Sequence, residues 1–373
     1  MDAARKIHVL TMVDRVVGGG GGETVAARIA VNLDAGRFAR TLCVTRPSAG
    51  EELERVRAAG VQVVELDRGG RLALGAWRKL ARYLREHPID ILHSHKFGSN
   101  VWAAVTKPLL PVPRLVTHEH SWAFSGDRAR LLLDRHVVSR AADRMVAVSD
   151  EDARRMVEVV GIPESKVTVV PNGVDIPPPA DPRKLRRELG LPDGTTVIGF
   201  VGSLRPEKRV DLIVDAFAQV RTARGDVHLV LVGAGPEEPA LRARAERHGA
   251  ADAITFAGFR ADATDLAAGF DVAVLASDRE GVPLSLLEYM ALGRAIVATR
   301  VGGIPATARD GEHALLVPPG DAGALAGALR RLVDEPAERA RLGEAARARQ
   351  EADYSFAGMM RRIERLYADV LEG

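Results

Sequence analysis

Two carboxylates, Glu280 and Glu288, lie on either side of a proline, Pro283. A proline suits the first turn of a helix, which places Glu288 in that helix and Glu280 in the loop before it. The N–H groups of residues 283–285 would then be the unpaired donors of a helix N-terminus, which attract a phosphate. One anion site between two acceptors for hydroxyl groups suits a sugar nucleotide, with one carboxylate for the sugar and one for the ribose. A solvated loop glutamate and an ordinary helix glutamate are the plain alternative.

A second group of charged residues follows the strand-like run 197–201. The run ends at Gly202, and Arg205 and Lys208 come shortly after it. A lysine offers a compact point charge and an arginine a planar fork for two oxygens, and together they can neutralise a diphosphate. We therefore interpret the two cations as candidates for that role, although a solvated basic turn has the same composition.

A run of glycines, residues 18–22, follows the first strand-like run and precedes Glu23 and a helical pattern. Glycines let the backbone approach a ligand closely, and the start of a helix favours an anion. The run is not a P-loop, because no Lys-Ser/Thr follows it, and it is not a dinucleotide-binding motif, because Glu23 stands in place of the last glycine. It is either a ligand-binding loop or a flexible surface loop.

Two His-x-His pairs, His93 with His95 and His118 with His120, end successive strand-like runs. Imidazole is a common ligand of zinc. Because side chains alternate between the faces of a strand, we expect each pair to contribute only one ligand to a given site. We therefore favour strand-end residues that face a cleft over a metal centre. Hydrogen-bonded structural histidines are the plain alternative.

The composition is that of a globular protein. With 373 residues, 46% hydrophobic and 27% charged, the chain can bury a large core and form two domains. The single cysteine, Cys43, cannot form an internal disulfide, and neither a signal peptide nor an apolar stretch of roughly 20 residues is evident. These features predict a cytoplasmic enzyme. Lys and Arg outnumber Asp and Glu by 26 to 21 in residues 1–175, so that half could contact an anionic membrane surface.

Short apolar runs alternate with helical patterns, which predicts an α/β protein with a doubly wound parallel sheet in each half. The proline-rich segment 176–182 would link an N-terminal domain, 1–175, to a C-terminal domain, 183–354. Because open α/β sheets bind ligands at the carboxyl ends of their strands, a cleft between the domains would hold the site. The predicted strands are 7–13, 41–45, 61–66, 89–92, 114–117, 144–148 and 167–170, then 196–201, 227–232, 254–257, 271–276, 295–299 and 314–317.

The stretch Glu280–Gly293, with the strand and the segment Val301–Pro305 that follow it, closely resembles the donor site of retaining glycosyltransferases of family 4. The resemblance implies the GT-B fold, in which two Rossmann-like domains face each other across a cleft. Residues 1–175 would bind the acceptor and residues 183–354 the nucleotide sugar. The final helix, residues 355–373, would cross back to the N-terminal domain.

The resemblance also implies catalytic roles. Glu280 would hold sugar hydroxyls, Lys208 and Arg205 would stabilise the departing diphosphate, and His120 would contact the transferred sugar, with His118 as its rival. The implied donor-binding residues are Glu288, Gly281, Val282, Pro283, Leu284, Gly202, Ser203, Gly233, Phe259, Gly20 and Gly21. The implied acceptor-side residues are Glu23, His95, His118 and Trp122.

The implied reaction transfers a sugar from a UDP- or GDP-sugar to an acceptor hydroxyl with retention, in cell-envelope, glycolipid or natural-product biosynthesis. We interpret no Asp-x-Asp pair as a metal motif, so no metal or other cofactor is expected. The acceptor is either lipid-linked or a soluble small molecule or glycan, and nucleic acid is not an expected partner. Two alternatives remain. One is a nucleotide-sugar epimerase or hydrolase of the same fold, and the other is a non-catalytic nucleotide-sugar-binding protein, suggested by Ser203 where the family commonly has arginine.

Overall fold

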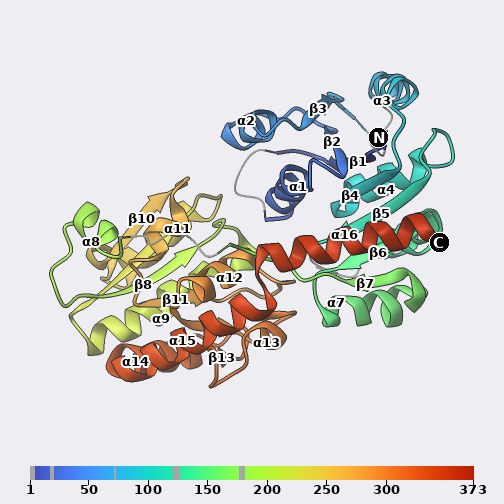
Figure 1. The fold of residues 1–373 in the computed structure, drawn as a ribbon. Coiled ribbons are helices and arrows are strands. Elements are labelled where there is room, and N and C mark those ends of the chain that lie inside the picture. The colour runs from blue at the N-terminus through green and yellow to red at the C-terminus, as the bar shows by residue number, and fades with distance from the viewer. Residues whose placement is uncertain (1–4, 17–20, 71–72, 121–126, 176–180) are drawn as a thin grey trace. The chain divides into compact units, whose positions relative to one another are not determined.

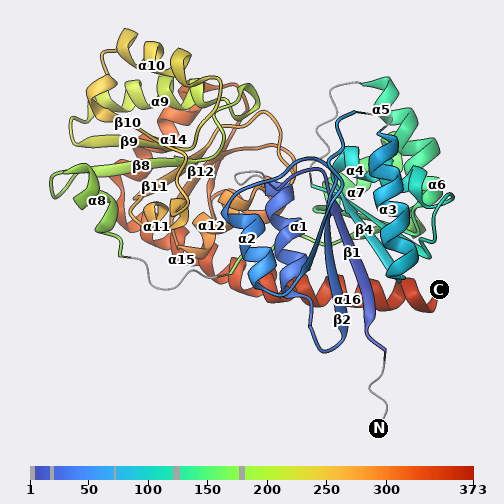
Figure 2. The same ribbon diagram turned by 90° about the horizontal axis from the view of Figure 1, so that it is seen from above.

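The computed structural model describes residues 5–16, 21–70, 73–120, 127–175 and 181–373. The chain forms two compact units (Figures 1 and 2), one of Met1–Pro171 with Met359–Gly373 and one of Asn172–Gly358. Residues 172–175, which the sequence assigns to the N-terminal domain, thus group with the second unit. Of the predicted linker, residues 176–180 lie outside the described residues.

The first unit is built on a parallel sheet of seven strands in the order β3-β2-β1-β4-β5-β6-β7. Every strand overlaps a predicted apolar run, although β2 begins three residues earlier and β4 ends three residues later than predicted; the α/β prediction is confirmed for this half. The strands are β1 (Ile7–Val13), β2 (Phe38–Val44), β3 (Gln62–Glu65), β4 (Ile91–His95), β5 (Arg114–Glu119), β6 (Arg144–Ala147) and β7 (Val167–Val169). The helices are α1 (Gly21–Asn32), α2 (Glu51–Ala58), α3 (Leu74–Glu86), α4 (Lys96–Thr106), α5 (Arg128–Leu133), α6 (Ser139–Ala141), α7 (Asp150–Arg155) and most of α16 (Phe356–Glu372).

Strand β1 buries apolar side chains on both faces of the sheet, since helices cover both. Leu10 and Met12 of β1 pack with Leu80 of α3 in one core. Val13, on the opposite face, packs with Ala27 of α1 in a second core. Burial on both sides explains why a parallel strand reads as a continuous apolar run rather than as an alternating pattern.

Helix α16 carries the chain back into the first unit. Its residues from Met359 onward belong to that unit. Tyr367 is fully buried there, and its hydroxyl lies 2.7 Å from Nδ1 of His93. Glu364 accepts a 2.7 Å hydrogen bond from Arg37. The last helix is therefore an integral part of the first unit rather than an appendage.

The second unit has a parallel sheet of six strands in the order β10-β9-β8-β11-β12-β13. The strands, again at predicted positions, are β8 (Thr196–Val201), β9 (Val227–Val232), β10 (Ile254–Gly258), β11 (Val272–Leu275), β12 (Ala295–Thr299) and β13 (Leu315–Val317). The helices are α8 (Lys184–Leu189), α9 (Val210–Ala223), α10 (Glu238–Arg247), α11 (Ala263–Ala267), α12 (Leu284–Ala291), α13 (Ile304–Thr307), α14 (Ala322–Asp334) and α15 (Pro336–Asp353). Among the described residues, no helix combines the length and the apolar character needed to cross a bilayer.

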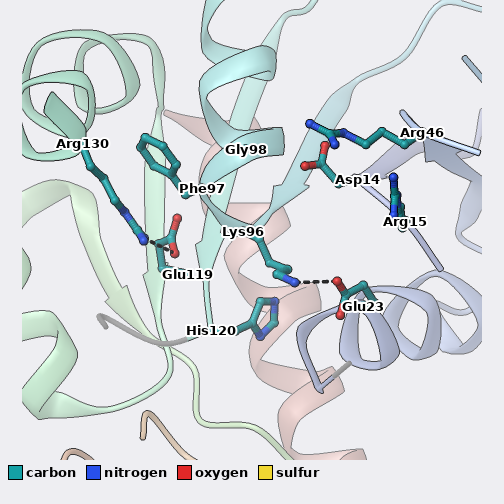
Figure 3. A pocket seen from close by; sticks show the side chains of 10 residues that line it. All are labelled: Asp14, Arg15, Glu23, Arg46, Lys96, Phe97, Gly98, Glu119, His120 and Arg130. Atoms are coloured by element: carbon teal, nitrogen blue, oxygen red, sulfur yellow. Dashed lines mark hydrogen bonds and ion pairs between the residues drawn. The ribbon is translucent and has the colours of Figure 1, made fainter. Parts of the chain in front are cut away.

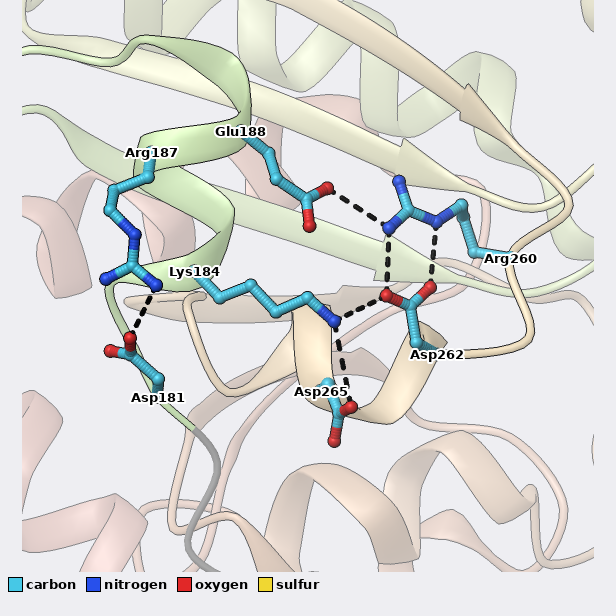
Figure 4. A network of polar contacts seen from close by, with 7 residues as sticks. All are labelled: Asp181, Lys184, Arg187, Glu188, Arg260, Asp262 and Asp265. Atoms are coloured by element: carbon cyan, nitrogen blue, oxygen red, sulfur yellow. Dashed lines mark hydrogen bonds and ion pairs between the residues drawn. The ribbon is translucent and has the colours of Figure 1, made fainter.

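A network of ion pairs attaches α8 to the segment after β10 (Figure 4). Lys184 reaches Asp262 at 2.6 Å, and Glu188 pairs with Arg260 at 3.1 Å. Arg260 also donates two hydrogen bonds of 2.8 Å each to the carboxylate of Asp262. These ion pairs thus connect α8 to the segment that follows β10.

Candidate functional site

The carboxyl ends of four neighbouring strands in the first unit surround a cavity of about 410 Å³ (Figure 3). Strands β2, β1, β4 and β5 lie next to one another in the sheet, so the residues that follow them meet at one edge. The cavity is lined by Asp14, Arg15, Glu23, Arg46, Lys96, Phe97, Gly98, Glu119, His120 and Arg130. Its volume falls in the range of about 300–1,000 Å³ that is typical of small-molecule sites.

Lys96 is the central cation of this cavity. Its Nζ lies 2.5 Å from Oε1 of Glu23 (Figure 3). Its backbone has φ = 70°, a left-handed conformation that costs a residue with a side chain on the order of 1–2 kcal/mol. Strain of this kind gathers at functional sites because surrounding contacts enforce it there. The sequence reasoning did not identify Lys96, and only its place directly after a strand end could have indicated it.

The glycine run contributes through the start of α1. Gly20 lies outside the described residues, and Gly21 is the first residue of the helix. Gly22 is the glycine that approaches other groups: a Cβ there would lie 2.9 Å from Cδ2 of His120 and 3.2 Å from Cδ of Lys96. Glu23 follows in the first turn and faces the cavity, where the acceptor side is expected.

The four histidines lie together, which corrects the expectation that each His-x-His pair contributes only one ligand to a site. Side chains alternate with a period of two residues, so the members of a His-x-His pair share one face of their strand. The rings of His93 and His95 are 4.2 Å apart between centroids, and those of His118 and His120 are 4.3 Å apart. All four line up over β4 and the end of β5.

Three of these histidines could be brought to one metal ion. The ligand nitrogens of His93, His95 and His118 lie within 4.8 Å of one another, whereas nitrogens at a tetrahedral zinc are about 3.4 Å apart for bonds of about 2.0–2.1 Å. The rings of His93 and His118 are nearly parallel, at 9°, with centroids 5.4 Å apart. A metal lies in the plane of each imidazole that it binds, so these rings would have to turn to share one. As they stand, they fit packed neutral imidazoles better than a metal centre.

Burial keeps these rings neutral. It lowers the pKa of His118 to about 3, and it lowers the pKa values of the other three well below 6.5. His118 is fully buried, and both its ring nitrogens lack a hydrogen-bond partner among the described residues. His120 is partly exposed, lines the cavity and lies 3.0 Å from His95 through their ring nitrogens. His120 and not His118 therefore reaches the cavity, while its contact with a sugar stays a prediction. Trp122 lies outside the described residues.

The second unit places Lys208 and Glu280 in direct contact. Lys208 Nζ lies 2.6 Å from Oε1 of Glu280, and the same oxygen accepts a 2.7 Å hydrogen bond from Ser277. The side chain of Glu280 is only 9% exposed. Arg205, by contrast, is exposed, and no side-chain hydrogen bond or ion pair joins it to Lys208 or Glu280 among the described residues. Of the two predicted cations, Lys208 is thus the one that the fold holds beside Glu280.

Helix α12 begins next to this pair. Pro283 is its N-cap residue, one position before the first turn in which the sequence placed it. No backbone acceptor for the N–H groups of Leu284 and Ser285 lies among the described residues, so both can face an anion. Glu288 is partly exposed in the middle of the helix.

The loop before α12 is fixed from several sides. Gly281, Val282 and Pro283 are buried, and the carbonyl of Val282 accepts a 2.9 Å hydrogen bond from Asn172. A Cβ at Gly302, whose φ is 52°, would overlap the carbonyl of Glu280, so this position needs glycine. These contacts hold the loop that carries Glu280, and the sequence reasoning assigned none of them.

The other predicted donor residues lie around the ends of β8, β9 and β10. Tyr289 of α12 accepts a 2.6 Å hydrogen bond from the backbone N–H of Val201, which ties the helix to the last residue of β8, directly before Gly202 and Ser203. A Cβ at Gly233 would lie 1.9 Å from the carbonyl oxygen of Gly202. Phe259 is 63% exposed beyond β10, with its ring available to a ligand.

The only Asp-x-Asp spacing in the sequence, Asp150 with Asp152, lies at the start of α7. Ser149 caps that helix by accepting from the backbone N–H of Asp152, and its hydroxyl donates to the Asp152 carboxylate at 2.8 Å. This reciprocal arrangement is typical of a helix N-terminus. The spacing therefore has a structural explanation.

Two family models match the chain. One, described as Glycosyltransferase Family 4, matches residues 19–176, and the other, described as Glycosyl transferases group 1, matches residues 195–335. Together they include the cavity of the first unit and the Lys208–Glu280 pair of the second.

Curated relatives agree with these matches. A D-inositol 3-phosphate glycosyltransferase of Acidothermus cellulolyticus is 36% identical over 277 residues, which are 68% of this chain and 61% of the relative. One of Thermobispora bispora is 31% identical over 307 residues, 76% of this chain and 71% of the relative. The match thus spans less than two thirds of the length of the first relative.

Solved structures share the fold. HepE of Anabaena in complex with UDP has a TM-score of 0.84 at 22% identity, covering 98% of this chain and 100% of that one. WaaG, a glycosyltransferase involved in lipopolysaccharide biosynthesis, has a TM-score of 0.77 at 16% identity, covering 98% and 100%. Likeness at such identities shows the fold, which is GT-B with two Rossmann-like units. Because the two family models and the curated relatives agree, the chain belongs to glycosyltransferase family 4, the glycosyl transferases group 1.

Proposed function

We propose that the protein is a retaining glycosyltransferase that moves a sugar from a UDP- or GDP-sugar to an acceptor hydroxyl without a divalent metal. The observation that carries the proposal is the Lys208–Glu280 pair beside the free N–H groups at the start of α12. A fixed cation and two backbone donors can stabilise the negative charge of a departing diphosphate, and positioned charge of this kind is usually the largest catalytic contribution.

Each donor residue has a distinct role in this proposal. Lys208 and the N–H groups of Leu284 and Ser285 bind the diphosphate, with Arg205 as a further cation from the exposed side. Glu280 accepts hydrogen bonds from sugar hydroxyls, and Glu288 accepts those of the ribose. Donor binding is expected to loosen the Lys208–Glu280 pair, since each partner gains a ligand group in exchange.

The acceptor would bind in the cavity of the first unit. His120 would contact the sugar, and His95 would hold the ring of His120 through the 3.0 Å contact between them. Glu23 and Lys96 would face the acceptor. D-Inositol 3-phosphate, named for the relatives, is one candidate for an acceptor panel, together with lipid-linked and other soluble acceptors.

Calorimetric binding of UDP-, GDP-, ADP- and TDP-sugars tests the donor assignment. Wild type, Glu288→Ala and Glu246→Ala are titrated in the presence of EDTA. Glu246 is an exposed residue of α10 and serves as the matched control. One nucleotide family is expected to bind wild type and the control equally, and Glu288→Ala about 10- to 100-fold more weakly, since hydrogen bonds to a charged group contribute about 1.5–3 kcal/mol. If no nucleotide sugar bound to wild type, the assignment of the donor site would be refuted.

Turnover separates transfer from the two alternatives. Glu280→Ala and Lys208→Ala are expected to depress kcat more than they weaken donor affinity. The anomeric configuration of the product, read by NMR, tests retention. Release of free sugar or of an epimer without an acceptor would instead indicate a hydrolase or an epimerase. Tight donor binding without turnover across the acceptor panel would indicate a binding protein. This alternative is tested because Ser203 stands where the family commonly has arginine.

A further inference from the structure

Two arginines follow neighbouring strands at the edge of the cavity in the first unit. Arg15 comes after β1 and Arg46 after β2, and the two strands pair in parallel up to Val13 and Val44. The pairing continues beyond the strands, because the N–H of Arg46 donates to the carbonyl of Asp14 at 2.8 Å. Both side chains line the cavity, next to each other in Figure 3.

The carboxylates of this cavity are all matched with other cations. Glu23 pairs with Lys96 at 2.5 Å. Asp14 pairs at 2.7 Å with Arg68, whose side chain is only 7% exposed. Glu119 lies 3.3 Å from Arg130 and accepts a 2.8 Å hydrogen bond from Asn100. No carboxylate of the cavity lining is therefore left over for Arg15 and Arg46.

Neither arginine has an ion pair or a side-chain hydrogen bond among the described residues of the chain. Two guanidinium groups that stay charged at all physiological pH values thus share one rim with no counter-charge of their own. Both side chains are exposed at this rim and can reach a ligand, and a guanidinium fork matches the oxygens of a phosphate in geometry.

The start of α4 adds to the attraction for an anion. This helix of eleven residues begins at Lys96, and Phe97 and Gly98 of its first turn line the cavity. No acceptor for the N–H groups of these two residues lies in the described part of the chain. The positive end of the helix dipole and the two arginines therefore face the same space.

We propose that this cavity recognises an acceptor that carries a phosphate monoester, and that Arg15 and Arg46 are the residues that bind the phosphate. A phosphate monoester has a charge of about −1.5 to −2 at pH 7, which matches the two unpaired arginines. The hydroxyl that receives the sugar would lie toward His120 and Glu23, at the other side of the same cavity. This inference rests on the proposed function, because it names the acceptor class of the same reaction.

Paired ligands that differ only in the phosphate test the inference. The probes are D-inositol 3-phosphate against inositol, and glycerol 3-phosphate against glycerol. Their affinities for the full chain are measured by calorimetry, with and without the nucleoside diphosphate that the donor panel identifies. At least one phosphorylated probe is expected to bind wild type at least about tenfold more tightly than its partner.

Arg46→Gln and Arg15→Gln are expected to reduce that preference about 10- to 100-fold. Arg78→Gln is the matched control, since Arg78 is an exposed residue of α3 outside the cavity, and it should keep the preference. Equal affinity for both members of each pair, together with no vesicle binding that needs phosphatidic acid and Arg46, would overturn the inference, as would a preference that survives both substitutions. Donor binding is measured separately, so a wild type that binds the donor but shows no phosphate preference in either arm refutes the acceptor class alone.

A second arm distinguishes a soluble acceptor from a lipid. Vesicles of phosphatidylcholine with and without phosphatidic acid, whose headgroup is a phosphate monoester, are sedimented with wild type and Arg46→Gln. Binding that needs both phosphatidic acid and Arg46, without any preference among the soluble probes, would assign the phosphate to a lipid-linked acceptor. Preference for a soluble phosphate without vesicle binding would assign it to a small molecule.

Discussion

Gly22→Ala tests whether the start of α1 positions His120. A Cβ at Gly22 would lie 2.9 Å from Cδ2 of His120, 3.0 Å from its Cγ and 3.2 Å from Cδ of Lys96. Carbon atoms in ordinary contact are about 3.5–4.0 Å apart, so the ring or the helix must move by about 0.5–1 Å. The ring cannot simply retreat, because His95 holds it at 3.0 Å between their ring nitrogens.

The expected effects are worked from that displacement. Misplacement of a catalytic contact by about 1 Å can cost about 100-fold in rate, so kcat should fall by roughly that factor if His120 contacts the transferred sugar. Overpacking costs about 1–3 kcal/mol, and replacing a helical glycine by alanine returns about 0.5–1 kcal/mol. The net loss of stability should be about 1 kcal/mol, which is far too small to unfold the protein.

Gly75→Ala is the matched control. Gly75 is the second residue of α3, as Gly22 is the second residue of α1, and a Cβ at Gly75 would meet nothing within 4 Å. This variant should be as stable as wild type or slightly more so, with unchanged kcat. The assays are urea unfolding, NMR of the histidine rings and the rate of sugar transfer. If Gly22→Ala matched Gly75→Ala in all three, the proposed positioning of His120 would be refuted.

Two further predictions concern stability. Burial lowers the pKa of His118 to about 3 from 6.5, so the unfolded state binds its proton more readily and stability falls as the pH drops below about 6.5. In urea unfolding, the difference in free energy of unfolding between wild type and His118→Gln should therefore be about 2 kcal/mol smaller at pH 5 than at pH 7. Burial raises the pKa of Glu119 to about 7, which has the opposite effect on stability, but this contribution is common to both proteins and cancels. A difference that does not change with pH would contradict the prediction. Tyr289→Phe leaves the N–H of Val201 without its acceptor and should destabilise the protein by about 1–3 kcal/mol. Tyr354→Phe is the control and should change the midpoint of urea unfolding little, since no side-chain hydrogen bond of Tyr354 lies among the described residues. Equal unfolding midpoints for the two variants would argue against the hydrogen bond.

The sheets could be predicted because each strand carries its own signal. A parallel strand covered on both faces is a continuous apolar run, and β11 reads in that way along its whole length. Helix ends were also visible where one residue determines them. Gly293, with φ = 64°, follows the last turn of α12 as its type predicts.

The contacts within the first cavity could not be predicted in the same way. Glu23 and Lys96 lie 73 residues apart in the chain, and nothing local relates them. A run of five glycines gives no sign of which one approaches His120, because that depends on a strand far along the sequence. For the same reason, the pairing of Asp14 with Arg68, which leaves Arg15 and Arg46 without carboxylate partners, is visible only in the folded chain.

The histidine cluster could have been predicted from the sequence, but the period of two residues in a strand was applied wrongly. His93 with His95, and His118 with His120, are separated by two positions on strands, and a period of two places such pairs on one face. The register of β4 against β5, with His95 opposite His118, then brings the two pairs together. The cluster followed from the sequence once the two strands were known to be neighbours.

The two units share one electrostatic arrangement, in which a lysine pairs with a largely buried carboxylate at the carboxyl ends of the strands. At the strand ends of the first unit Lys96 pairs with Glu23 at 2.5 Å, and at those of the second Lys208 pairs with Glu280 at 2.6 Å. In each pair the carboxylate is largely buried, at 14% and 9% exposure, so the lysine offsets a charge that would otherwise be costly. An anionic ligand that binds such a lysine frees the carboxylate to accept hydrogen bonds from hydroxyl groups. Under the proposed function, the Lys208–Glu280 pair would bind the diphosphate and the sugar hydroxyls of the donor together, so an alanine at either partner should cost more than the loss of a single contact.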